Sequence, residues 1–113
     1  MTTLTLDLTQ VEQAVLRGFG AAREAAAAAH ARIGERDACG FAWVTVFDVR
    51  SNSKLGKMLA EHGFRKAYGG GLQLWDPSKH PTQSVSVLEA GASAMAAELK
   101  AAGLTAYAGS RLD

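Results

Sequence analysis

Apolar positions mark a long helix near the start of the chain. Over residues 9 to 33 they recur three or four positions apart, which places side chains on one face of a helix. The stripe consists of Val11, Val15, Gly18, Ala22, Ala26, Ala29 and Ile33. Thr9 followed by Glu12 predicts a capping box at the helix start, and Gly34 predicts its end.

A strand that is apolar on both sides is predicted next, over residues 41 to 49. Phe41, Trp43 and Phe47 alternate with Val44 and Val46, so neither side of the strand is polar. Strands of this kind are usually buried on both faces. The pattern therefore predicts a strand at the centre of the sheet.

A short helix is predicted from 54 to 62. Ser53 or Asn52 is suited to cap its first turn, because each offers a side-chain oxygen to the free backbone N–H groups. Gly63 followed by Phe64 predicts a Schellman ending, in which the apolar residue folds back on the helix.

Glycine and proline divide the following stretch. Three consecutive glycines, 69 to 71, predict a bulge or a turn between a short strand and a firmer strand over 72 to 75. The two prolines of the chain lie within 76 to 83, which predicts a loop.

The last part of the chain predicts one more helix and one more strand. Ser86 with Glu89 forms a second possible capping box for a helix that reaches about residue 102, and a strand over 104 to 108 precedes the tail 109 to 113. The order α-β-α-β-α-β predicts that residues 1–113 form a single small α+β domain, with helices packed on a small sheet.

Composition adds an expectation about assembly. The 113 residues include 22 alanines and 12 glycines, so few bulky side chains remain to build a core. The Ala-rich helix over 9–33 has the least apolar bulk. We therefore expect it to pack closely against another helix and to be the self-association element of a homo-oligomer.

Charge and hydropathy limit which binding partners and which cellular compartment are expected for the chain. The net charge of +1 argues against nucleic-acid binding driven by bulk charge. Apolar runs are too short to cross a membrane, and Met1 to Gln10 shows no secretory signal, so a cytoplasmic location is predicted. Cys39 is the single cysteine and is expected to be a small core residue.

The strongest local candidate for a site joins the first strand to the second helix. Arg50, Ser51, Asn52, Ser53 and Lys54 combine two cations with hydrogen-bonding side chains at a helix start, where backbone N–H groups favour anions. This pattern predicts a phosphate or other anion site. The alternative is a well-capped helix with a solvated basic face.

Four further residues are candidate ligand contacts. Trp75 could stack on a base or ring, or could be a core aromatic beside the glycine turn. Gln83 and Ser84, at the end of the polar loop, could bind a polar ligand or simply connect two elements. Arg111 offers a guanidinium fork for phosphate or carboxylate, in a tail that is either frayed or docked.

Known catalytic patterns do not occur in the sequence. His30, His62 and His80 lack the spacing of metal ligands, and Cys39 has no obvious histidine partner. The sequence therefore predicts a non-catalytic protein without a metal or cofactor.

Five segments carry a resemblance to known proteins: Asn52–Lys57, Gly69–Trp75, Pro81–Ser84, Glu89–Ala92 and Gly109–Asp113. Together they resemble a group of small accessory proteins of tailed bacteriophages and prophages. The resemblance covers the C-terminal two thirds of the chain and implies action in the cytoplasm of a host cell.

Small phage proteins of this size serve the virion or counter host defence. One class, which includes sponges that oppose Thoeris systems, binds a cyclic nucleotide signal without cleaving it. By analogy at the level of the fold, the chain is expected to bind a small phosphorylated or nucleotide-like ligand and to sequester a defence signal. The alternative is a virion or protein-interaction component without a small-molecule ligand. Nucleic-acid binding and nucleotide-directed catalysis rank below both.

Overall fold

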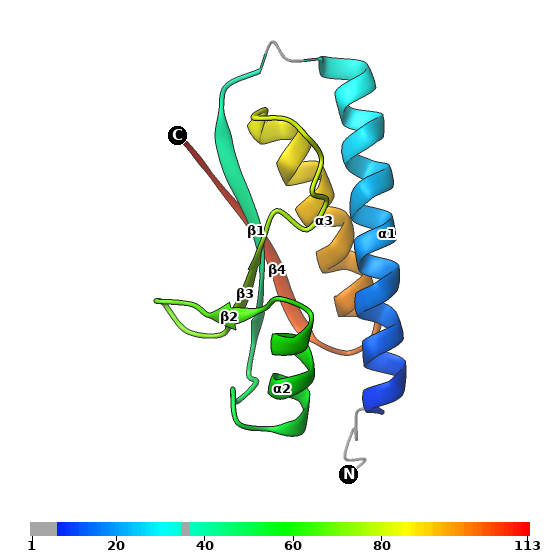
Figure 1. Cartoon of the computed structure of the whole chain (residues 1–113), viewed down its shortest axis with the longest axis vertical. Coiled ribbons are helices and arrows are strands. Elements are labelled where there is room, and N and C mark those ends of the chain that lie inside the picture. The colour runs from blue at the N-terminus through cyan, green and yellow to red at the C-terminus, as the bar shows by residue number, and fades with distance from the viewer. Residues whose placement is uncertain (1–6, 35–36) are drawn as a thin grey trace.

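The computed structural model of the chain describes residues 7–34 and 37–113; most of the segment Met1 to Gln10 lies outside them. Within the described ranges, three helices and a four-stranded antiparallel sheet form the α+β architecture that the sequence predicts (Figure 1). The elements are α1 (Leu8–Ile33), β1 (Gly40–Phe47), α2 (Lys54–Glu61), β2 (Arg65–Lys66), β3 (Leu72–Trp75), α3 (Val85–Ala101) and β4 (Thr105–Leu112). The short strand β2 makes the order α-β-α-β-β-α-β.

The strand order is β2-β3-β1-β4, so β1 is an interior strand, as predicted. Trp43 of β1 lies opposite Trp75 of β3 on one side and opposite Gly109 of β4 on the other. From β1 onward the connectivity is β-α-β-β-α-β, the split βαβ arrangement.

Two helices are capped by residues other than those that the sequence predicts. The side chain of Asp7 caps α1 by accepting from the Thr9 backbone N–H at 2.9 Å, so Thr9 is not the cap. Ser84, not Ser86, caps α3 and accepts from the Val87 N–H. In both cases an acceptor two residues earlier in the chain occupies the capping position.

The start and end of α2 follow the prediction. Ser53 accepts from the Gly56 N–H at 3.0 Å. At the other end, the Phe64 N–H donates to the Leu59 carbonyl and the Gly63 N–H to the Ala60 carbonyl, both at 3.1 Å, which is the Schellman pattern.

The glycine run also forms the predicted turn. Residues 67 to 71 connect β2 to β3, and the Ala67 N–H donates to the Gly71 carbonyl at 3.0 Å. Gly70 and Gly71 have φ angles of 105° and 79°, a region that favours glycine.

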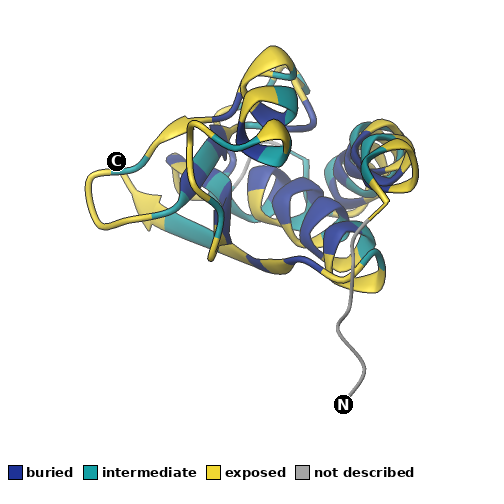
Figure 2. Cartoon of the chain, turned by 90° about the horizontal axis from the view of Figure 1, so that it is seen from below, coloured by how far each residue is buried: buried dark blue, intermediate teal, exposed yellow. Residues whose placement is uncertain are grey.

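The sheet is covered on one face only, which contradicts the prediction that β1 is buried on both sides. Ala42, Val44 and Val46 face α3 and are buried, whereas on the alternating side Phe41 is 39% and Phe47 37% exposed. Trp43 on that side is half-buried, and Thr45 is covered by its neighbours on the same face. Figure 2 shows why: α3 lies against the sheet, and α1 lies on the far side of α3.

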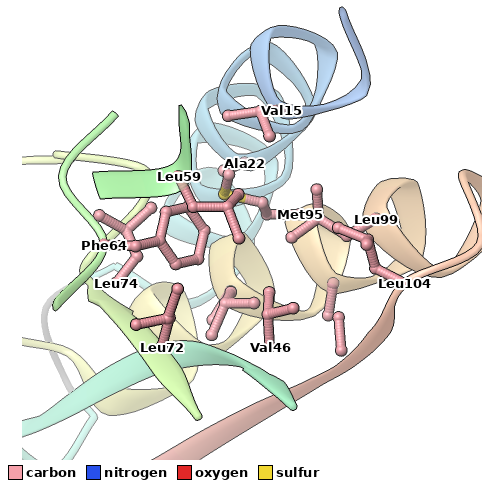
Figure 3. Packing of buried hydrophobic residues seen from close by; sticks show 14 of the residues in the cluster. Val15, Ala22, Val46, Leu59, Phe64, Leu72, Leu74, Met95, Leu99 and Leu104 are labelled. Carbon is pink, nitrogen blue, oxygen red and sulfur yellow. The ribbon is translucent and has the colours of Figure 1, made fainter. Parts of the chain in front are cut away.

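The core joins the inner face of the sheet to all three helices. Figure 3 shows Leu59 and Phe64 beside Leu72 and Leu74, near the end of α2. Met95 of α3 lies in the same cluster, together with residues of α1 and β1.

The stripe of small residues on α1 has its partner within the same chain. A Cβ at Gly18 would lie 2.8 Å from Met95 Cγ, and one at Gly91 would lie 3.2 Å from the Ala22 carbonyl oxygen. The stripe expected at a subunit interface is therefore already buried against α3. Self-association of the chain stays a prediction that needs another surface.

The C-terminal tail is docked as part of the sheet. β4 continues to Leu112, so the predicted strand over 104 to 108 is too short, and Arg111 lies opposite Phe41. Cys39, expected in the core, is exposed and donates to the Gln83 side-chain oxygen at 3.4 Å.

Replacing Ala26 by Leu is expected to destabilise the fold, because Ala26 is fully buried beside Val87 of α3. Overpacking of this kind costs about 1–3 kcal/mol of unfolding free energy. The neighbouring Ala27 is exposed, so Ala27→Leu is the matched control and should change stability by less than about 0.5 kcal/mol. Thermal unfolding measures both variants; equal effects would contradict the described packing of α1 on α3.

Candidate ligand-binding site

The uncovered outer face of the sheet gathers most of the chain's exposed aromatic side chains. Residues that lie opposite each other in neighbouring strands point to the same face, so the strand register defines the rows of this surface. The rows are Arg111–Phe41, Gly109–Trp43–Trp75, Tyr107–Thr45–Gln73–Arg65 and Thr105–Phe47.

One end of the outer face carries three aromatic rings in edge-on or tilted contact, together with a cation, which we call the Trp75 cluster: Phe41, Trp43, Trp75 and Arg111. The ring centroids of Trp43 and Trp75 are 4.8 Å apart, and those of Phe41 and Trp75 are 5.9 Å apart. The Arg111 guanidinium carbon lies 5.4 Å from the Phe41 centroid and 5.8 Å from that of Trp75. Trp75 is 42% exposed, so the core alternative for this residue is wrong.

A glycine on β4 makes room for the Trp43 ring. A Cβ at Gly109 would lie 2.5 Å from Trp43 Nε1 and 2.7 Å from Cε2, closer than real atoms approach. The indole therefore lies over the bare backbone of β4, which holds Trp43 flat against the sheet and beside Trp75.

The orientation of Trp75 is held by a chain of hydrogen bonds. The indole Nε1–H donates to the Gln73 side-chain oxygen at 2.7 Å, and the Gln73 amide donates to the Thr45 hydroxyl at 3.2 Å. Because Thr45 is buried, the chain anchors the exposed indole to the centre of the sheet.

A hollow of about 210 Å³ lies beside the Trp75 cluster, between β1 and the loop that precedes α3. Phe41 and Trp75 line it, together with Asp76, Thr82 and Gln83. Pockets that enclose a whole drug-sized ligand measure about 300–1,000 Å³. The hollow therefore suits one ring of a ligand, with the remainder on the open face.

Positive charge also lies on the other side of Trp75. A groove of about 490 Å³ at the outer edge of β3 is lined by Trp75 and by three cations, Arg65, Lys66 and Lys79. Arg65 donates to the carbonyls of Ala60 and Phe64, and Lys79 donates to the Trp75 carbonyl at 3.3 Å. Hydrogen bonds thus hold Arg65 at the end of α2 and Lys79 next to Trp75.

Ser84, a predicted ligand residue, is buried and serves the start of α3. Its hydroxyl donates to Asp37 at 2.8 Å, and the same carboxylate oxygen accepts from the Ser86 backbone N–H at 2.7 Å. Hydrogen bonds from the Ser86 hydroxyl and N–H, and then from Ser84, lower the pKa of Asp37 from 3.8 to about 2. Asp37 and Ser84 together occupy the N-terminus of α3, so Ser84 stabilises the fold and does not face the hollow.

The predicted anion segment, Arg50 to Lys54, lies at the opposite end of the sheet (Figure 1). Ser53 is occupied as the cap of α2, while Arg50, Ser51, Asn52 and Lys54 are exposed. Phe41 and Phe47 are six residues apart on β1, about 20 Å at 3.4 Å per residue. The structure therefore groups Trp75 and Arg111, with Gln83 at the adjoining hollow, and separates them from Arg50 to Lys54.

The same end of the outer face as Arg50 carries a second pair of aromatic rings. Phe47 and Tyr107 have centroids 6.1 Å apart, and Lys100 reaches from α3 to within 4.7 Å of the Tyr107 centroid. We call Phe47, Tyr107 and Lys100 the Tyr107 cluster.

Sequence reasoning missed Phe41, Trp43, Gln73 and the whole Tyr107 cluster as surface residues. The signal was present in β1, where every second residue is bulky or aromatic, but its hydrophobicity was attributed to burial. The contact between His30 Nδ1 and His80 Nε2, at 2.9 Å, was also missed, since 50 residues separate the two rings.

Among residues 7–34 and 37–113, no group of three or more His, Cys, Asp or Glu side chains is placed to hold a metal ion. No helix within the same ranges is both long enough and apolar enough to cross a bilayer. Comparison of the chain with protein-family models, curated proteins and solved structures finds no match.

The lowered pKa of Asp37 predicts a pH-dependent contribution to stability. A carboxylate whose pKa is lower in the folded state stabilises the fold above its unfolded pKa, and this contribution is lost as pH falls from about 4 to about 2. Asp37→Ala should therefore unfold at lower urea concentration than the wild type at pH 7, with the difference shrinking over that interval. Glu24→Ala, which removes an exposed carboxylate of α1, is the control. A difference between wild type and Asp37→Ala that stays constant down to pH 2 would contradict the assigned role.

Proposed function

We propose that the chain is a binding protein for a nucleotide-like ligand, which it holds at the Trp75 cluster without transforming it. The observation that carries this proposal is the position of Arg111, whose guanidinium lies within 6 Å of two exposed aromatic rings on one open face. A base binds by stacking on aromatic side chains, and a guanidinium binds phosphate through paired hydrogen bonds. The cluster offers both contacts at one place.

The shape of the surface supports a flat ring with an attached anion. The hollow beside Phe41 and Trp75 has room for a ring, and the Gln83 side chain at its wall offers polar atoms for hydrogen bonding to a base edge. Arg111 lies near the same two rings, so a phosphate joined to that base through its sugar would lie within reach of the guanidinium on the open face.

The biological role we propose is sequestration of a nucleotide signal. The sequence resemblance to small phage and prophage accessory proteins supports this role, because such proteins include binders of host defence signals. Protein purified gently from expressing cells would carry the ligand, so native mass spectrometry before and after denaturation identifies the bound mass.

The strength of a single-nucleotide complex follows from its two main contacts. Stacking on an aromatic side chain contributes about 1–3 kcal/mol per base, and a hydrogen bond to a charged group contributes about 1.5–3 kcal/mol. A binding free energy of about 4 kcal/mol corresponds to a millimolar Kd. A mononucleotide is therefore expected to bind weakly unless further contacts are made.

Charge reversal at two exposed cations tests the placement of the phosphate. Arg111→Glu should weaken the binding of adenosine 5′-monophosphate at least about tenfold, because it replaces a cation beside the base by an anion. Lys54→Glu makes the same change of net charge at the opposite end of the sheet, and should leave the affinity unchanged. Isothermal titration calorimetry measures both variants against the wild type.

Two results would count against the proposal. Loss of binding in Lys54→Glu with normal binding in Arg111→Glu would place the phosphate at the start of α2. A wild-type protein that binds neither this nucleotide nor any cellular nucleotide would refute nucleotide binding itself. Circular dichroism spectra confirm that each variant is folded.

A further inference from the structure

The outer face repeats the same combination of groups at both ends. At one end lie Phe41, Trp43 and Trp75 with Arg111, and at the other lie Phe47 and Tyr107 with Lys100. Each cluster therefore pairs exposed aromatic rings with one cation less than 6 Å from a ring centroid. A single mononucleotide bound at the Trp75 cluster would make no contact with the Tyr107 cluster.

The distance between the two clusters limits what can span them. Trp43 and Phe47 are four residues apart on β1, about 14 Å at 3.4 Å per residue, and Tyr107 lies in the row between them, about 7 Å from the row of Trp43. Stacked neighbouring bases rise only about 3.4 Å, so bases on the two clusters cannot be stacked on each other. A single strand with its bases splayed apart on separate aromatic side chains meets this requirement.

The surface between the clusters is polar and suits a sugar–phosphate connection. The half-buried Gln73 lies there beside the buried Thr45, in the row that runs from Tyr107 to Arg65. No Asp or Glu occupies an outward-facing position of the described strands, whereas Arg65 and Arg111 do. The net charge of +1 for the whole chain therefore conceals an excess of cations at the outward strand positions, with Asp76 in the wall of the adjoining hollow.

The same charges disfavour a second copy of the chain as the occupant. Face-to-face packing of two outer faces would place Arg65, Lys100 and Arg111 of both copies in one interface, with no carboxylate at the outward strand positions to pair with them. An aromatic, multiply anionic partner matches both the rings and the cations.

From these observations we infer that the outer face binds a single-stranded oligonucleotide, with one base on the Trp75 cluster and a second on the Tyr107 cluster. This inference rests on the proposed function and defines its ligand as a strand of at least several nucleotides. Arg111 and Lys100 each hold a phosphate near the base that stacks beside them.

The test compares adenosine 5′-monophosphate with single-stranded hexa-adenylates, one of RNA and one of DNA, by calorimetric titration. The hexamer should bind at least about tenfold more tightly than the mononucleotide, because it stacks on two clusters. A preference for the RNA or the DNA hexamer identifies which strand the face recognises.

Two tyrosine variants show whether the hexamer binds more tightly because it contacts the second cluster or only because it offers more bases to the Trp75 cluster. Tyr107→Ala should weaken hexamer binding about fivefold or more and leave mononucleotide binding unchanged. Tyr68→Ala is the matched control, since Tyr68 lies fully exposed in the hairpin turn and should have no effect. Trp75→Ala should weaken both ligands.

Salt dependence provides a second readout. Two phosphate contacts on a single strand predict a slope of about −1.4 for log K against log salt. Lys100→Ala removes one of these contacts and should reduce the magnitude of this slope by about 0.7.

The outcomes distinguish the two proposals. Hexamer affinity that is unchanged in Tyr107→Ala would overturn the oligonucleotide inference, while Trp75-dependent mononucleotide binding would leave the proposed function standing. Equal losses in Tyr107→Ala and Tyr68→Ala would likewise overturn the extended site. A protein that binds neither the mononucleotide nor the hexamers would overturn both proposals together.

Discussion

Packing of α3 across one face of the sheet determines where the strand side chains lie. A strand alternates its side chains between two faces, so turning Val44 and Val46 toward α3 forces Trp43 and Phe47 outward. The longest helix, α1, adds no cover to that outer face, because it packs on the far side of α3. The exposed aromatic surface is thus a direct result of having one helical layer against the sheet.

The outer face is a rigid surface because its side chains are supported from below and from the side. Trp43 lies on the backbone of β4 at Gly109, and Trp75 is tied through Gln73 to the buried Thr45. Side chains held in this way lose little conformational freedom when something stacks on them, which favours binding. The supporting residues are therefore as much a part of the candidate site as the rings that they hold.

Features set by local hydrogen bonding could be predicted from the sequence. The Ser53 cap, the Schellman ending at Gly63 and the glycine turn each depend on residues within a few positions of one another. The predicted caps of α1 and α3, Thr9 and Ser86, were wrong, because several acceptors lie within two or three residues and the sequence does not rank them. The interior position of β1 could be inferred from its hydrophobicity, but hydrophobicity alone cannot tell which face another layer will cover.

The residues of the candidate site could likewise be predicted only in part from the sequence. Trp75 and Arg111 were singled out as residue types suited to a ring and an anion, and the antiparallel register brings them together. Arg50 and Lys54 were singled out on equal grounds, yet β1 carries the chain to the other end of the sheet before they occur. Only the pairing of strands decides which of these residues become neighbours.

The position of the two tryptophans has a consequence for spectroscopy. Both indoles of the chain lie on the outer face, whereas the largest core ring is Phe64, a weak chromophore. Tryptophan emission therefore responds to whatever covers or uncovers this surface, while far-ultraviolet circular dichroism follows the three helices. A change in emission without a change in helicity marks an event at the sheet surface, and loss of both signals together marks unfolding.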